Sequence, residues 1–127
     1  MKNSFTANTT DGPRLFSFRD GLYFYGAYHN LEFTEQDRGK TLTVSVDSHQ
    51  LSLCWIELWP AHYDGKDWVK WTTDRGQDAL ALTGHKPHPN PQLTWKIEPG
   101  KYSIYFVNSS PTDKIKHQII AYQIEIK

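Results

Sequence analysis

Strict alternation of polar and apolar residues marks three segments of this chain as half-buried β-strands. They are residues 41–47, 93–97 and 120–126. Successive side chains of a strand point to opposite faces of its sheet, so each segment is predicted to bury one face and expose the other. Segments 102–107 and 51–59 are instead apolar on nearly both faces, which predicts strands in the middle of a sheet or strands with a bulge.

The rest of the chain contains turn residues and shorter apolar patterns, which predict one tight turn, one helical turn and further short strands. Pro99 and Gly100 predict a tight turn that returns strand 93–97 as strand 101–108. A single helical turn is expected at 34–37, with Thr34 as its cap and Gly39 as its end. Residues 78–82 fit either a strand or a helix because five residues cannot fix the period. Further strands are predicted at 15–18, 22–25, 31–33 and 68–72.

This spacing of short strands predicts an all-β fold, an antiparallel β-sandwich or jelly roll of about eight strands. A chain of 127 residues fits one domain, spanning 1–127, with 1–13 as a loose N-terminal segment. No stretch repeats with a period of 20–50 residues, which excludes solenoids and propellers. The predicted core residues are Leu42, Val44, Val46, Leu53, Trp95, Ile97, Tyr102, Ile104, Ile120, Tyr122 and Ile124.

Charge and targeting features narrow the classes of partner. Lys and Arg number 14 and Asp and Glu also 14, for a net charge of zero, so nucleic acid is not an expected partner. Zero net charge offers little repulsion against a homo-oligomer. No apolar run reaches the length of a transmembrane segment, and the polar N-terminus predicts no signal peptide, which leaves both a cytoplasmic and a processed, exported protein open. Cys54 is the single cysteine, so no internal disulfide is expected.

The C-terminal third carries a resemblance to a known family. Residues 93–105, which contain the run Pro99-Gly100-Lys101-Tyr102, and the closing strand 121–126 resemble the end of bacterial pre-peptidase C-terminal domains. The likeness is greatest to the collagen-binding domains of clostridial collagenases. It implies a β-sandwich of similar length and the role of an accessory binding module. Collagen-binding members place tyrosines where this chain has Val107 and Ser109, so the resemblance implies no binding residues.

The densest aromatic segment is the candidate binding site. Aromatic faces stack on sugar or proline rings while neighbouring polar groups bind hydroxyls, and aromatic rings also fill the space between sheets. Trp55 and Trp95 lie within apolar alternation and are assigned to the core. A surface platform for a carbohydrate or an exposed protein segment is predicted at Trp59, Tyr63, Asp64, Trp68 and Trp71. A second cluster, whose role stays open between core and surface, contains Tyr23, Tyr25, Tyr28 and His29.

Signatures of metal binding and catalysis are absent from the sequence. His85 and His88 are two imidazoles in a proline-rich loop, but zinc needs three or four ligands, so no metal site and no cofactor are predicted. Cys54 lies in a strand pattern where burial would leave it inert. No catalytic motif is present, which predicts a recognition module rather than an enzyme. The alternatives are a self-assembling or partner-binding, toxin-like β-sandwich and, after that, a small hydrolase.

Overall fold

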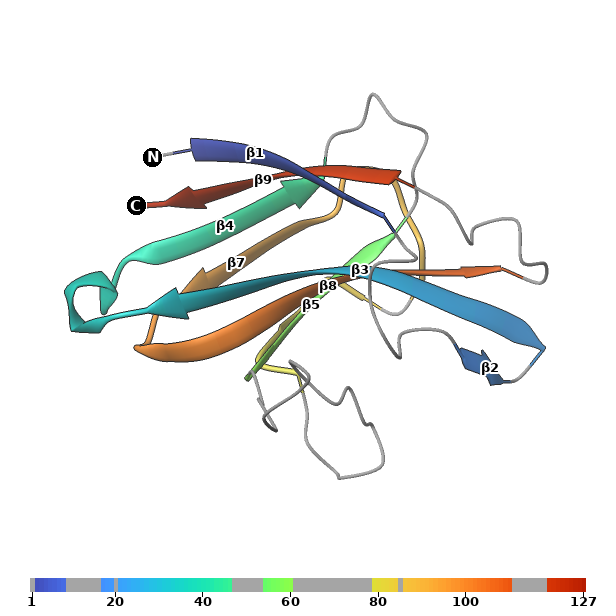
Figure 1. The fold of residues 1–127 in the computed structure, drawn as a ribbon, viewed down its shortest axis with the longest axis horizontal. Helices are drawn as coiled ribbons and strands as arrows, with labels where there is room; N and C mark the ends of the chain where they lie inside the picture. The colour runs from blue at the N-terminus through green and yellow to red at the C-terminus, as the bar shows by residue number, and fades with distance from the viewer. Residues whose placement is uncertain are drawn as a thin grey trace.

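The computed structural model describes residues 2–8, 17–19, 21–46, 54–60, 79–84, 86–110 and 119–127. They form two antiparallel sheets that pack against each other (Figure 1). The architecture confirms the predicted all-β sandwich of about eight strands. Its elements are β1 (Lys2–Asn8), β2 (Ser17–Arg19), β3 (Leu22–Phe33), the 3₁₀ turn η1 (Glu35–Asp37), β4 (Thr41–Val46), β5 (Trp55–Pro60), β6 (Ala81–Leu82), β7 (Gln92–Lys96), β8 (Gly100–Ser110) and β9 (Ile119–Ile126).

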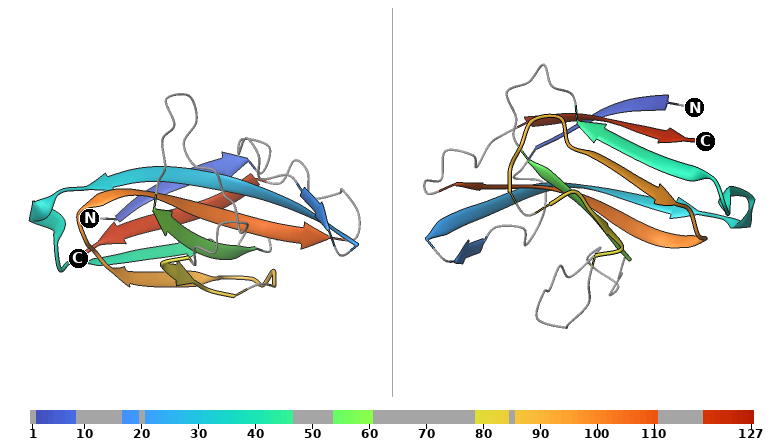
Figure 2. Two further views of the ribbon diagram at one scale, coloured as in Figure 1. Left: turned by 90° about the horizontal axis from the view of Figure 1, so that it is seen from below. Right: turned by 180° about the vertical axis from the view of Figure 1, so that it is seen from behind.

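The strand order explains how the two layers form. One sheet has the order β1-β9-β4-β7 and the other the order β2-β3-β8-β5-β6. Every connection except β2–β3 and β5–β6 passes from one sheet to the other. Figure 2 shows the strands of the two sheets from below and from behind. β6 and β7, the last strands of their sheets, therefore lie on the same side of the sandwich.

Alternation along the strands builds the core between the sheets. β4 buries one face and leaves hydroxyl side chains on the other, as predicted. Trp95 is half-buried at the margin of the core, and Leu53 lies outside the described residues. The other predicted core residues are all buried, namely Leu42, Val44, Val46, Ile97, Tyr102, Ile104, Ile120, Tyr122 and Ile124.

The two strands that are apolar on both faces lie inside the five-stranded sheet. β8 is its central strand, flanked by β3 and β5. Ile104 and Phe106 join the core between the sheets, whereas Tyr105 and Val107 belong to a second buried cluster. Because alternate residues occupy opposite faces, this second cluster lies on the outer face of the sheet. The sequence prediction of mid-sheet strands is confirmed for β8.

The Pro99–Gly100 turn does not form the predicted hairpin. β7 pairs with β4, while β8 pairs with β3 and β5 in the other sheet. The same turn chemistry therefore carries the chain between layers instead of folding it back within one layer. Gly100 is required here because its φ is +145° and a Cβ would lie 3.2 Å from the Tyr102 hydroxyl.

Two further predictions of local structure differ from the structure. Segments 22–25 and 31–33 are not separate strands but belong to β3, which pairs with β8 in one unbroken register. That long ladder overrides the turn-like residues at its middle. Segment 1–13 is not wholly loose, because β1 pairs with β9 along its whole length. The predicted strand 68–72 lies outside the described residues.

The expected helical turn and the ambiguous segment are both resolved. Thr34 caps η1 and its backbone N–H donates to the Asp37 carboxylate at 3.0 Å. Gly39 follows with a φ of +85°, which favours glycine. Within 78–82, Ala81–Leu82 is a strand. Over the described ranges, we find no helix with the length and apolar character needed to cross a membrane.

Candidate functional site

Only one residue of the predicted aromatic platform lies in the described part of the chain. Trp59 is 8% exposed and packs against Trp55, Tyr105 and Val107. Its ring is part of a packed cluster, which contradicts the expectation that Trp59 presents an open stacking surface. The other predicted platform residues lie outside the described residues, namely Tyr63, Asp64, Trp68 and Trp71.

We call the group of Trp55, Glu57, Trp59, Tyr105 and Val107 the closed cluster. Glu57, 5% exposed, lies between two indoles, and its carboxylate accepts hydrogen bonds from Trp55 Nε1 at 2.6 Å and Trp59 Nε1 at 2.8 Å. Burying a carboxylate is costly unless donors compensate it. Burial raises the pKa of Tyr105, a hydrogen bond with Ser103 lowers it, and Glu57 raises it further.

The strand β3 separates the members of the second aromatic cluster. Tyr28 packs against the closed cluster on the outer face of the sheet. His29, the next residue, lies on the inner face, where its Nδ1 is 2.7 Å from the Tyr122 hydroxyl. Neighbouring residues of a strand point to opposite faces, so Tyr28 and His29 do not form one site. The side chains of Tyr23 and Tyr25 lie outside the described residues.

A hollow of about 580 Å³ lies at the side of the sandwich where β6 and β7 end the two sheets. This volume is within the roughly 300–1,000 Å³ of small-ligand sites. Leu80, 44% exposed, precedes β6, and its N–H donates to the Leu58 carbonyl at 2.8 Å. We call this the open hollow; its lining residues are Arg38, Gly39, Leu80, Trp95, Lys96, Ile97 and Glu98.

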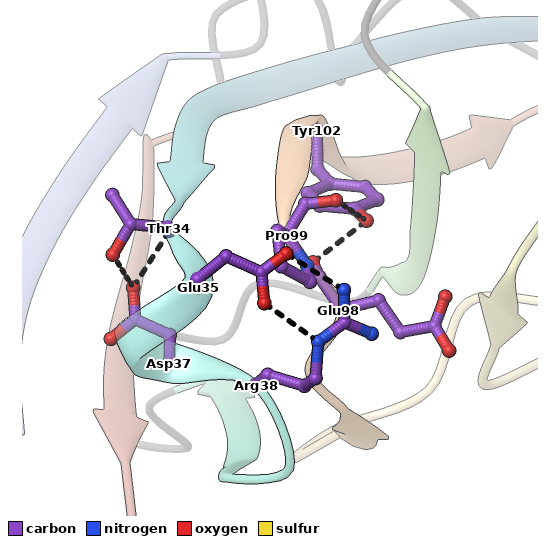
Figure 3. Close-up of polar contacts among 7 residues, drawn as sticks. All are labelled: Thr34, Glu35, Asp37, Arg38, Glu98, Pro99 and Tyr102. Carbon is purple, nitrogen blue, oxygen red and sulfur yellow. Dashed lines mark hydrogen bonds and ion pairs between the residues drawn. The ribbon is translucent and has the colours of Figure 1, made fainter.

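Trp95 is the aromatic residue of the open hollow, and Tyr102 holds it in place. The two rings meet edge to face, with their centroids 4.8 Å apart. The Tyr102 hydroxyl donates to the carbonyls of Glu98 at 2.8 Å and Pro99 at 3.3 Å (Figure 3). A tyrosine that bonds back to the connection before its own strand fixes the corner between two sheets. The corner therefore sets the position of the Trp95 ring.

Charged side chains surround the rim of the open hollow. Arg38 donates from Nε and Nη2 to the two carboxylate oxygens of Glu35, both at 2.9 Å (Figure 3). The hydrogen bond with Arg38 lowers the pKa of Glu35, and the same bond raises the pKa of Arg38. Lys96 forms no ion pair with the residues that the structure describes. An apolar ring thus lies beside cationic and anionic groups that can bind hydroxyl or peptide groups.

An isolated β-bridge places His88 beside Cys54. The pairing is through the backbone, and His85 lies outside the described residues. Cys54 is buried, as expected, and burial raises the pKa of its thiol to about 12. Within the described residues, no group of three His, Cys, Asp or Glu side chains is placed to hold a metal ion.

The open hollow is not predicted from the sequence, because the apolar alternation around Trp95 favours a core position for its ring. Its alternation with Leu93 and Ile97 places Trp95 on the inner face, as assigned, but β7 is an edge strand and the ring reaches the margin of the sandwich. The proximity of Pro99 and Gly100 was the available signal that the strand ends there. No protein-family model and no curated protein matches this sequence.

Proposed function

We propose that this protein is a non-enzymatic recognition module that binds a carbohydrate or an exposed protein segment at the open hollow. The main observation that supports binding is the half-buried Trp95 ring, which contacts Tyr102 and lines a hollow of about 580 Å³. A preorganised aromatic ring loses little side-chain entropy when a ligand stacks on it. The resemblance to pre-peptidase C-terminal domains supports the same general role.

The groups around Trp95 fit recognition chemistry. Arg38 and Glu98 carry opposite charges on the rim, and Leu80 adds apolar surface to the same hollow. Convergent polar groups around an apolar surface fix the orientation of a ligand. Hydrolysis would require two titratable groups in acid and base roles. Arg38 is a fixed cation on the rim because Glu35 binds its guanidinium through two hydrogen bonds, an arrangement that suits binding.

Glycan and peptide arrays with the whole protein test this proposal, followed by titration calorimetry of each positive probe. Trp95→Ala is expected to weaken binding about five- to thirtyfold, because one well-placed aromatic contact contributes about 1–2 kcal/mol. Leu80→Ser and Leu82→Ser form a matched pair, since the side chains are 44% and 41% exposed but only Leu80 lines the open hollow. Leu80→Ser is expected to weaken binding and Leu82→Ser to leave it unchanged.

Light scattering distinguishes ligand binding from assembly. A monomer at all concentrations supports a ligand site, whereas a stable dimer that covers Trp95 reassigns the open hollow to self-association. A ligand whose affinity is equal in the wild type, Trp95→Ala and Leu80→Ser contradicts the proposed location. Far-UV circular dichroism of each variant confirms that any loss of binding comes from a folded protein.

A further inference from the structure

The edge strand β7 exposes backbone hydrogen-bonding groups beside the open hollow. β4 occupies one side of β7, and the bonds Ile97 N–H to Lys40 O at 2.8 Å and Val46 N–H to Pro91 O at 3.2 Å fix the phase of this ladder. In an antiparallel pair, every second residue directs its N–H and C=O toward the partner strand. Residues 91, 93, 95 and 97 therefore face β4.

The intervening residues, Gln92, Thr94 and Lys96, direct their backbone groups to the other side of β7. In the described ranges, no hydrogen bond joins those groups to another residue. The side chains of all three residues are exposed. An edge of this kind is a template for a further strand.

The edge of β7 and the open hollow meet at Lys96. Lys96 lines the hollow, has no acidic partner among the described residues, and belongs to the free edge. Trp95 and Leu80 supply apolar surface at the same place. Along an added strand, side chains would alternate between the apolar mouth of the hollow and the polar outer face of the sheet.

We propose that β7 binds an extended segment of a partner protein by strand addition, with an apolar side chain in the open hollow and an acidic side chain beside Lys96. This inference rests on the proposed function and narrows its ligand to a protein segment. Backbone bonds supply affinity in this mode, and the pockets for alternate side chains supply specificity.

Charge favours such a partner over a second copy of the chain. A second β7 would bring its own Lys96 to an edge that already carries this cation, whereas Arg38 outside β7 is paired with Glu35. Lysine on an edge strand disfavours pairing with another strand that does not compensate its charge. An acidic side chain placed beside Lys96 and away from Glu98 gives Lys96 an ion-pair partner.

Hydrogen exchange of the backbone amides tests the geometry directly. The probe is the capped peptide Thr-Val-Glu-Val-Thr-Val-Glu-Val-Thr. In the free protein, the amides of Gln92, Thr94 and Lys96 are expected to exchange rapidly, while those of Leu93 and Trp95 are protected by β4. Saturation with the peptide is expected to slow exchange of the first three at least about tenfold. Unchanged exchange in the presence of bound peptide overturns the proposal.

Two alternately N-methylated versions of the peptide separate strand addition from side-chain binding. Each version methylates every second amide, so one set faces β7 and the other faces away. One version is expected to lose binding at least about tenfold and the other to retain it. Equal behaviour of the two versions, whether both bind or both fail, overturns the proposal.

Thr94→Pro tests the protein side, with Thr94→Ala as its matched control. Proline removes the outward N–H and is tolerated on an edge strand, because this N–H takes no part in the β4 ladder. Thr94→Pro is expected to weaken peptide binding at least about tenfold and Thr94→Ala less than about twofold. If Thr94→Pro does not fold, the N-methylated peptides decide the question.

Further outcomes separate this inference from the proposed function. A sugar probe that depends on Trp95 but not on Thr94→Pro supports the open hollow as a site and overturns strand addition. Loss of peptide binding in Thr94→Pro with full binding in Trp95→Ala supports strand addition while contradicting the role of the ring. Amide protection that rises with protein concentration in the absence of peptide identifies a second copy as the occupant and overturns the proposal.

Discussion

The closed cluster and the open hollow both bring tryptophan together with charged side chains, yet they use the aromatic ring differently. In the closed cluster, Trp55 and Trp59 donate both indole N–H groups to Glu57 and are buried. In the open hollow, Trp95 is half-buried and held by an edge contact with Tyr102. Aromatic density along the sequence therefore does not decide which ring is available to a ligand.

The position of each strand in its sheet explains the difference. β5 lies next to the central strand β8, and its residues from Trp55 to Trp59 are buried on both faces. β7 ends the other sheet and crosses to β8 at the Tyr102 corner, which leaves the margin of Trp95 open. The closed cluster is buried, whereas the open hollow keeps part of its aromatic and apolar surface exposed.

The largest expected effect is on stability and contrasts Trp59 with Trp95. Trp59→Ala empties a packed site and is expected to lower the free energy of unfolding by about 3–5 kcal/mol. Trp95→Ala is expected to cost about half as much or less, because its ring is only partly buried. Urea unfolding monitored by circular dichroism measures both. Equal losses would remove the distinction between the two regions.

Replacing Glu57 tests whether the closed cluster depends on its buried carboxylate. Glu57→Ala removes the acceptor of two indole N–H groups and is expected to cost about 2–3 kcal/mol. Glu57→Gln is the control, since it keeps one acceptor oxygen at nearly the same volume, and should cost less. If Glu57→Ala unfolds at the same urea concentration as the wild type, the carboxylate does not stabilise the cluster.

The sequence predicts the layers better than it predicts the site, for physical reasons. Alternation in β4 and β9 reports burial of one face directly, and these strands and their core residues were predicted correctly. Pairing depends on contacts between distant segments, so the hairpin expected at Pro99 and Gly100 was wrong although the turn itself was right.

The location of the aromatic site illustrates the same limit. Trp59 lies beside charged residues in the sequence, which favoured a surface position, but Glu57 compensates its indole N–H and allows burial. Trp95 lies within an apolar pattern, which favoured the core, but the order of the sheet places it at the margin. Local pattern reports the face of a strand, whereas exposure of that face depends on its neighbours.

A smaller effect is expected at the corner that supports the open hollow. Tyr102→Phe removes the hydroxyl that bonds the Glu98 and Pro99 carbonyls and should cost about 1 kcal/mol. The phenyl ring still contacts Trp95, so the hollow should keep part of its ligand affinity. Tyr102→Leu also removes the ring contact and should lower affinity further. Equal ligand affinity in both variants would show that the ring of Tyr102 does not position Trp95.

The smallest expected effect is a dependence of stability on pH that arises in neither region. His29 lies between the sheets, 2.7 Å from the Tyr122 hydroxyl, with the Phe5 ring at a centroid distance of 4.7 Å. Burial lowers the pKa of His29, and burial raises the pKa of Tyr122 to about 12, which keeps its phenol protonated. Of the two side chains that contact His29 here, Tyr122 is titratable and Phe5 adds no charge.

The sign of this dependence follows from proton binding. Below its ordinary pKa of about 6.5, the His29 side chain binds a proton in the unfolded chain before it does so in the folded protein. The contribution of His29 to the free energy of unfolding is therefore expected to be constant above about pH 7. It should fall as the pH decreases from 6.5 to the folded-state pKa. His29→Gln should flatten this slope, as measured by urea unfolding between pH 5 and 8. Because β1 meets β3 through Phe5 and His29, acid should increase amide exchange in β1. The amides of β5 and β7 that are protected at neutral pH should keep their protection. An NMR titration that gives His29 a raised pKa would contradict this account.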